Sequence, residues 1–235
     1  MTSDPESVSL SPTRTHITFQ NGKHNIIIKI VTTMRTFDNK LKWIDHIAYT
    51  RNTISRGIGI IQKAKHFLTK KSLMDLYYAF IYPYLSYCVE VWGHTEDSHL
   101  RPLCMLQNKI IRIISFSYYR ANAVKIFIDL NILPLKKLVQ HRISLMMYKY
   151  NYDMLPMAMN EMYVKNFEIH HHNTRNTNLL HIPGDTHTRN FRYRSVLLWN
   201  ELVTRGFNFK VSFPKFKKTL KFYLINNVIE IGYGT

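Results

Sequence analysis

The chain has 235 residues, with 32 lysines and arginines against 15 aspartates and glutamates, so its formal net charge is +17 when histidine is neutral. Its hydrophobic residues, 46% of the total, exclude a disordered basic tail. Two cysteines exclude a disulfide-rich secreted scaffold. Because the chain is basic and also 13% aromatic, we expect a folded protein that binds a polyanion, and nucleic acid fits this combination best.

Residues 12–33 are predicted to form a β-hairpin. The segment 15–19 alternates between polar and apolar residues, Asn21-Gly22 is a turn signal, and residues 26–31 are rich in β-branched side chains. A lone hairpin is only marginally stable in water. We therefore expect it either to pack on the rest of the chain or to be the remaining edge of a larger sheet.

Residues 43–68 have helical periodicity. Arg56, Lys63 and Lys70 follow one another at intervals of seven, on the face opposite an apolar stripe. This basic ridge is either an ordinary solvated face or a binding surface, and the spacing alone does not decide between them. The apolar stripe consists of Ile47, Ile54, Ile58, Ile61 and Leu68.

A second helix is predicted to begin at Ser72, because Ser72 and Asp75 nearly match a capping box, and Pro83 should break it. A third helix is expected at about 97–116, with Lys109 and Arg112 on its outer face. A short helix at 123–130 and a long one from Pro134 complete a helical body that ends at Leu155-Pro156.

The last part of the chain has a different pattern. Residues 191–198 are predicted as a short strand that runs into a helical turn at Trp199-Asn200, and Ser212 should cap a final helix. One face of that helix would carry Phe213, Phe216, Leu220 and Leu224, and the other Lys215, Lys217, Lys218 and Lys221.

The predicted fold is mainly α. It comprises an extended segment at 1–35, a helical body at 36–155 and a small mixed C-terminal subdomain at 156–235. The most apolar stretch, 73–92, is interrupted by Asp75, Pro83 and Glu90, so we interpret it as core and not as a membrane span. We expect an intracellular protein, in the nucleus or the cytoplasm, because residues 1–11 do not form a signal peptide.

The residues that enzymes use are scattered. Glu96-Asp97, at a helix start, is the single adjacent acidic pair, and neither a glycine-rich phosphate loop nor a Gly-x-Ser-x-Gly elbow occurs. A zinc site is a weak alternative, because its candidate ligands have the spacing of no common zinc finger, and the run of three histidines at 170–172 lacks partner ligands. The residue chemistry therefore favours binding over catalysis. The candidate zinc ligands are Cys88, His94, His99 and Cys104.

A set of short motifs points to one family. Asp38-Asn39-Lys40-Leu41-Lys42-Trp43-Ile44-Asp45-His46-Ile47 resembles the Asp-x-x-Leu-x-Trp-x-x-His-Ile segment that follows the palm in reverse transcriptases of non-LTR (LINE, jockey-like) retrotransposons. Further stretches look like the same family in the same order, so that the resemblance covers about residues 36–225. They lie at 58–61, 76–88, 91–93, 106–112, 130–133, 173–175, 199–200 and 216–218.

This resemblance implies a thumb-like helical bundle and a C-terminal extension that grip the template–primer backbone. It assigns nonspecific binding of RNA or RNA–DNA duplex to the basic helix faces and makes 1–35 a hairpin remnant of the palm edge. The Tyr/Phe-x-Asp-Asp motif of the palm has no counterpart here, so we expect no cofactor in this chain, with Mg²⁺ belonging to the palm, and no polymerase activity alone. The expected nucleic-acid-binding residues are Arg56, Lys63, Lys70, Lys109, Arg112, Lys215, Lys217, Lys218 and Lys221.

Two other functions stay open at this point. The chain could be an inert or repurposed transposon-derived domain that is structural or binds a protein partner. A sequence-specific helix-turn-helix regulator is the third alternative, although no compact recognition-helix pattern is visible. The sequence does not indicate an oligomeric state.

Overall fold

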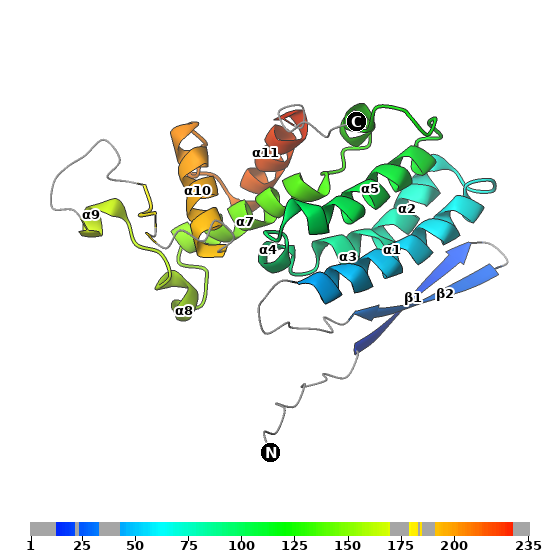
Figure 1. The fold of residues 1–235 in the computed structure, drawn as a ribbon, viewed down its shortest axis with the longest axis horizontal. Helices are drawn as coiled ribbons and strands as arrows, with labels where there is room; N and C mark the ends of the chain where they lie inside the picture. Colours follow the sequence, from blue (N-terminus) through cyan, green and yellow to red (C-terminus); the bar gives the residue numbers. More distant parts are fainter. Residues whose placement is uncertain are drawn as a thin grey trace, which may run out of the picture. The chain divides into compact units, whose positions relative to one another are not determined.

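The computed structural model describes residues 13–21, 24–32, 43–169, 179–182, 184 and 191–227, and for the first two ranges it describes the backbone alone. Across these residues the fold is mainly helical, as the sequence predicts (Figure 1). The predicted strand at 191–198 is replaced by a helix. The elements are β1 (Thr13–Asn21), β2 (His24–Thr32), α1 (Ile44–Ala64), α2 (Lys70–Phe80), α3 (Tyr82–Ser86), α4 (Val89–Trp92), α5 (Asp97–Ile114), α6 (Ala123–Asp129), α7 (Leu135–Asn151), α8 (Met157–Asn160), α9 (Asn166–Ile169), α10 (Phe191–Thr204) and α11 (Phe213–Asn226).

The chain divides into two compact units, residues 1–85 and residues 86–235. This division differs from the predicted boundaries at 35 and 155. The boundary at 155 does not separate two bodies, because α7, which precedes it, packs against both α10 and α11, which follow it. Helices α10 and α11 therefore pack on α7, within the second compact unit.

Strands β1 and β2 form an antiparallel pair in which Thr13 is opposite Thr32 and Asn21 is opposite His24. This antiparallel register is the one expected when a short connection joins two consecutive strands. That this pair is a remnant of a polymerase palm remains a prediction.

In the first unit, α1 packs against α2. Ile54, Ile58 and Ile61 of α1 are buried, as are Leu73 and Tyr77 of α2, so the predicted apolar stripe does face the core within α1. Gly57 lies at the closest approach, because a Cβ atom there would be 2.9 Å from Cδ1 of Ile81.

Two predictions, the cap of the second helix and the extent of the apolar stripe, are wrong at the boundary between α1 and α2. Thr69, and not Ser72, is the N-cap of α2, and its Oγ1 accepts a hydrogen bond from the backbone N–H of Ser72 at 3.3 Å. Thr is also a favoured N-cap residue, and with Thr69 in this role the helix begins about one turn earlier than expected. Leu68 lies beyond the end of α1 and therefore does not extend its apolar stripe.

In the second unit, α7 is the central helix. It packs against α4, α5, α10 and α11, and most of its side chains are buried (Figure 1). Gln107 of α5 connects α5 to the start of α7. The side-chain amide of Gln107 donates to the oxygen of Leu133 at 3.0 Å and accepts from the N–H of Leu135 at 2.8 Å. A helix that is surrounded on all sides also buries polar residues, which explains the burial of Lys137 and His141.

Helix α10 corrects the prediction of a strand at 191–198. Ser195, Val196, Trp199 and Leu202 are buried, a spacing that places them on one helical face toward the core. The strand preference of Tyr193 and Val196 is worth at most about 1 kcal/mol each and depends on context, so packing against α7 decides the conformation. Within α10, Asn200 also holds the segment at 180, with hydrogen bonds of 2.9 and 2.8 Å to the backbone of Leu180.

Candidate nucleic-acid interface

The predicted basic ridge does not lie on one helix. Arg56 and Lys63 are exposed on α1, where Arg56 Nη2 donates to Thr53 Oγ1 at 3.5 Å. Lys70 is exposed too, but it is the first residue of α2. The ridge is therefore wrong as a single stripe, because the chain leaves α1 after Ala64 and turns before Lys70.

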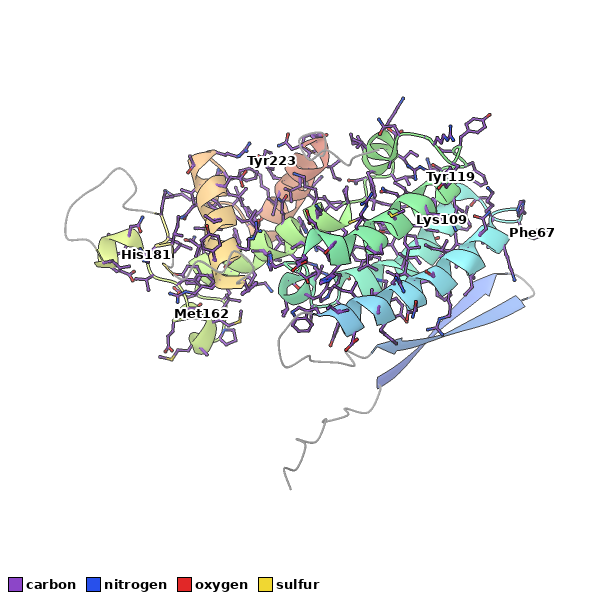
Figure 2. All side chains as sticks on the ribbon, in the orientation of Figure 1. Phe67, Lys109, Tyr119, Met162, His181 and Tyr223 are labelled. Atoms are coloured by element: carbon purple, nitrogen blue, oxygen red, sulfur yellow. The ribbon has the colours of Figure 1, made fainter. Side chains whose placement is uncertain are left out.

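The turn between α1 and α2 exposes an aromatic residue that the sequence pattern does not reveal. Phe67 is 89% exposed, and Lys65 and His66 precede it directly (Figure 2). The available signal was a phenylalanine in a Lys-rich segment between the end of one helix and the Thr69 cap of the next. Periodicity could not reveal it, because the turn belongs to neither helical pattern.

The two predicted cations of α5 differ in their surroundings. Lys109 is exposed (Figure 2). Arg112 is half-buried, and its Nε donates to the oxygen of Ala121 at 2.9 Å. Arg112 holds the turn that follows α5, and this contact commits one of its donors to the fold.

Of the four predicted lysines of α11, Lys217 and Lys221 lie close enough to α7 to act on His141. Lys215, Lys217 and Lys218 are exposed, and Lys221 is half-buried. Phe216 anchors the buried face of α11, because its ring stacks on Tyr148 of α7 at a centroid distance of 4.6 Å.

A second anchor fixes the start of α11. The Tyr148 hydroxyl donates to the oxygen of Val211 at 2.5 Å, just before Ser212, which is the N-cap of the helix. The Ser212 side chain makes no capping hydrogen bond. The tyrosine contact and the ring stacking together set the rotation of α11, so the lysine face has a defined direction relative to α7.

Three cations converge where α7 and α11 meet. The pKa of His141 is lowered to about 4, chiefly by burial and in addition by the positive charges of Arg142, Lys217 and Lys221, whereas the hydrogen bond to the oxygen of Lys217 opposes this shift. Burial also lowers the pKa of Lys221, and the neighbouring Lys217 adds to the effect. We call Arg142, Lys217 and Lys221 the α7–α11 cluster.

No carboxylate comes from either helix to offset this charge, because the sequences of α7 and α11 contain no aspartate or glutamate. The sequence reasoning found the two lysines but did not include Arg142. Arg142 follows His141 directly on α7, whereas the two lysines act on His141 because α11 packs against α7.

The cysteines and histidines do not form a metal site in the part of the chain that the structure describes, where no three side chains among His, Cys, Asp and Glu are placed to hold an ion. Cys88 is half-buried and Cys104 is buried, and both are free thiols. Burial raises the pKa of Cys104 to about 11, so its thiol stays protonated at neutral pH. The histidines at 170–172, and the motif at 173–175, lie outside the described residues.

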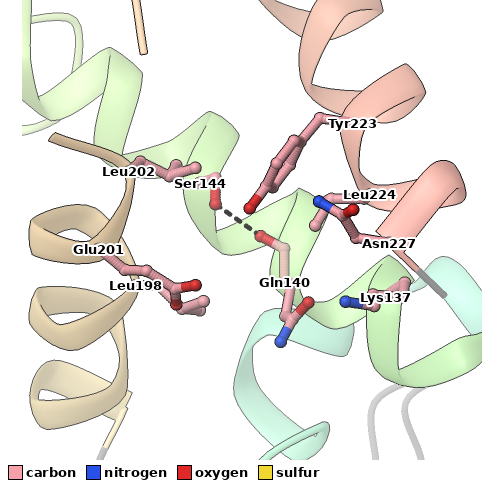
Figure 3. Close-up of a pocket in the computed structure, with 9 residues that line it drawn as sticks. All are labelled: Lys137, Gln140, Ser144, Leu198, Glu201, Leu202, Tyr223, Leu224 and Asn227. Atoms are coloured by element: carbon pink, nitrogen blue, oxygen red, sulfur yellow. Dashed lines mark hydrogen bonds between the residues drawn. The ribbon is translucent and has the colours of Figure 1, made fainter. Parts of the chain in front are cut away.

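A small cavity of about 40 Å³ lies among α7, α10 and α11 (Figure 3). Its walls include Lys137, Gln140 and Glu201, and Ser144 on the same wall donates to the oxygen of Gln140 at 2.8 Å. Substrate pockets usually occupy about 300 Å³ or more. The cavity has room for a few water molecules, and we assign no ligand to it.

No protein-family model matches the chain, and searches of curated proteins and of solved structures found no match. None of the helices within the described ranges is long and apolar enough to cross a membrane. The geometry of the cationic surfaces is therefore the structural observation on which a functional proposal can rest.

Proposed function

We propose that this chain binds the sugar–phosphate backbone of RNA or RNA–DNA duplex, without sequence preference, through its cationic helix surfaces. In this proposal it is the part of a non-LTR retrotransposon reverse transcriptase that follows the palm and grips the template–primer. The thumb-like role, the hairpin as a palm remnant and the absence of catalysis by this chain alone belong to the same proposal.

The α7–α11 cluster carries the proposal. Arg142, Lys217 and Lys221 lie close enough to act together on His141, and neither helix supplies an acid. Like charges held together destabilise the fold unless solvent or an anion compensates them. A phosphate backbone supplies regularly spaced negative charges and would relieve this repulsion.

The chemistry also fits binding without sequence preference. Lys and Arg contact phosphate oxygens that are identical for every sequence, and each neutralised phosphate releases counterions. Lys215 and Lys218, which are exposed on α11, add two further cations to the cluster, so that several phosphates can be contacted at once. Arg56, Lys63, Lys70 and Lys109, which are also exposed, are further candidates for phosphate contact.

The test is the salt dependence of affinity for a 20-base-pair RNA–DNA hybrid, measured by fluorescence anisotropy. We expect log K to fall against log [salt] with a slope of several units, at about 0.9 per neutralised phosphate. Lys217→Glu/Lys218→Glu should weaken binding and reduce the slope by about 2. A hybrid of unrelated sequence should bind equally well.

A matched control separates a local effect from a change of net charge. Arg51→Glu/Arg101→Glu removes the same total charge from two exposed residues on α1 and α5, which are not among the proposed contacts. It should leave the slope closer to that of the parent chain. Equal losses in both variants, or a flat slope in the parent, would refute the proposal and leave a structural or protein-binding domain as the alternative.

Catalysis is tested separately. With this chain alone, template–primer, Mg²⁺ and deoxynucleotides, we expect no primer extension, because the paired carboxylates that hold catalytic metals in polymerases have no counterpart in the sequence. Clear incorporation would overturn this part of the proposal without affecting the binding part.

A further inference from the structure

The turn between α5 and α6 exposes three aromatic side chains. Tyr118 is 90% exposed, Tyr119 84% and Phe116 54%. Figure 2 shows Tyr119 in the loop that follows α5. We call residues 115–122 the aromatic turn. Neither tyrosine has a ring contact with another aromatic residue in the described part of the chain, so both ring faces are accessible.

The aromatic turn is held by its own hydrogen bonds. Arg112 Nε donates to the oxygen of Ala121 at 2.9 Å, and the oxygen of Arg112 accepts from the N–H of Ser117 at 3.0 Å. The Ser115 and Ser117 hydroxyls are 2.7 Å apart. Two backbone groups of the turn are thus tied to Arg112, and the rings are presented from a defined backbone.

The start of α6 is fixed as well. The N–H of Ala121 donates to the oxygen of Tyr118 at 3.0 Å, and Asn122 caps the helix by accepting from the N–H of Val124 at 2.9 Å. Exposed rings on an ordered turn need little further ordering when they bind, which reduces the entropic cost of stacking.

The charge around the turn is one-sided. From Ser98 to Ile128 the sequence has no acidic residue, and five cations lie in the same interval. Arg120 is exposed directly beside Tyr119. A partner with a flat apolar surface and negative charge therefore complements the turn. The five cations are Arg101, Lys109, Arg112, Arg120 and Lys125.

We infer that the aromatic turn binds a single strand of RNA or DNA, with Tyr118 and Tyr119 stacking on unpaired bases and Arg120 contacting the adjacent phosphates. Bases stack on aromatic side chains whatever their sequence, and neighbouring cations follow the backbone. This inference rests on the proposed nucleic-acid role and adds to it a second contact, which reads unpaired bases and not the duplex backbone.

An anionic membrane surface fits the turn less well. Interfacial membrane binding depends on a broad apolar helix face, whereas the turn exposes two hydroxyl-bearing rings, the single apolar ring of Phe116 and no aliphatic side chain larger than Ala121. The isoleucines that precede the turn, Ile113 and Ile114, are buried. We therefore choose the nucleic-acid strand as the occupant and treat the membrane as an outcome of the test.

The experiment uses the full chain and two 20-nucleotide probes, oligo(dT) and an oligonucleotide of the same length made of abasic sugar-phosphates. Both probes carry the same charge, but only the first has bases to stack. We expect the parent chain to bind oligo(dT) about tenfold or more tightly than the abasic probe. Tyr118→Ala/Tyr119→Ala should abolish this preference, whereas Tyr118→Phe/Tyr119→Phe should retain it.

A failure of this inference can be distinguished from a failure of the proposed function. The alanine variant should keep the parent affinity and salt slope for the 20-base-pair hybrid, and its melting temperature should be unchanged because the two side chains are exposed. A parent chain that binds the hybrid but does not distinguish oligo(dT) from the abasic probe overturns the inference alone. A parent chain that binds no probe overturns both.

Vesicles of phosphatidylcholine and phosphatidylserine provide the remaining comparison. We expect the alanine substitutions to leave any vesicle binding unchanged. Loss of vesicle binding together with an unchanged preference for oligo(dT) would overturn the inference in favour of a membrane contact.

Discussion

His141 of α7 places its Nε2 3.4 Å from the backbone oxygen of Lys217 of α11. A carbonyl oxygen can only accept, so Nε2 carries a proton and donates this hydrogen bond. Arg142, Lys217 and Lys221 act on this ring, so a second proton on it would add a buried positive charge near three existing cations.

We expect the fold to lose stability in acid. The pKa of His141 and that of His94 are both lowered to about 4, in each case chiefly by burial. Between about pH 6.5 and 4 the unfolded state therefore binds protons that the folded state does not, so the free energy of unfolding falls as pH falls, by up to about 1.4 kcal/mol per pH unit for each histidine. Urea unfolding at pH values from 7 to 4.5 measures this slope.

Substitution separates the contribution of one histidine. His141→Phe keeps an aromatic ring of similar shape and removes the titrating group, so its slope between pH 6.5 and 4.5 should be shallower than that of the parent. His66→Gln removes an exposed histidine and serves as the control. An unchanged slope in His141→Phe would contradict the assignment.

Gln107→Leu should destabilise the fold by about 2–4 kcal/mol, although leucine has nearly the same size. The substitution leaves the oxygen of Leu133 and the N–H of Leu135 without their partner in a buried position. Chemical denaturation measures the loss. Asn108→Leu, at the neighbouring half-buried position of α5, should cost much less, and equal costs would show that the two hydrogen bonds do not stabilise the start of α7.

Two glycines should respond oppositely to alanine. A Cβ on Gly93 would overlap Cγ2 of Val139, so Gly93→Ala should lower the melting temperature and cost about 1–3 kcal/mol. Val139→Ala should relieve part of that cost when the two changes are combined. A double variant that loses the full sum of the single costs would contradict this contact.

Gly59 is the counterpart on α1. It lies inside the helix with open space around it, so Gly59→Ala should stabilise by about 0.5–1 kcal/mol through lower entropy of the unfolded chain. Thermal unfolding of the single variant measures the gain, and a loss of stability would show that Gly59 is not helical in solution.

The two thiols should react at different rates with a disulfide reagent such as DTNB at pH 8. Cys104 is buried and burial raises its pKa to about 11, whereas Cys88 is only half-buried, with its pKa raised by burial and by Glu90. Since the thiolate is the reactive form, Cys88 should react first and Cys104 only as the fold opens. Cys88→Ser should retain only the slow phase, and a fast phase in that variant would contradict the burial of Cys104.

The sequence predicted the helices best where apolar residues recur strongly. The third and last predicted helices correspond to α5 and α11, because their buried residues keep a helical spacing over at least three turns. It failed at 191–198, where aromatic and β-branched residues suggest a strand but packing against α7 makes a helix. It also misplaced the start of α2, because Thr69 and Ser72 are both acceptable caps.

The candidate site, too, could be predicted from the sequence only in part. Lys217 and Lys221 are four residues apart, so their shared helix face was readable from spacing. That Arg142 joins them, and that Arg112 is partly committed to Ala121, depends on contacts between segments far apart in sequence. The exposure of Tyr118 and Tyr119 likewise depends on which surfaces the helices cover.

The sequence by itself determined the excess of positive charge and the predominance of helix. Lysine and arginine remain ionised at neutral pH in nearly any fold, and a repeat near 3.6 residues buries an apolar face only as a helix. The tertiary structure decided which cations meet and which aromatic rings stay in solvent. Distances between side chains on different helices are set by packing, and no local pattern in the chain encodes them.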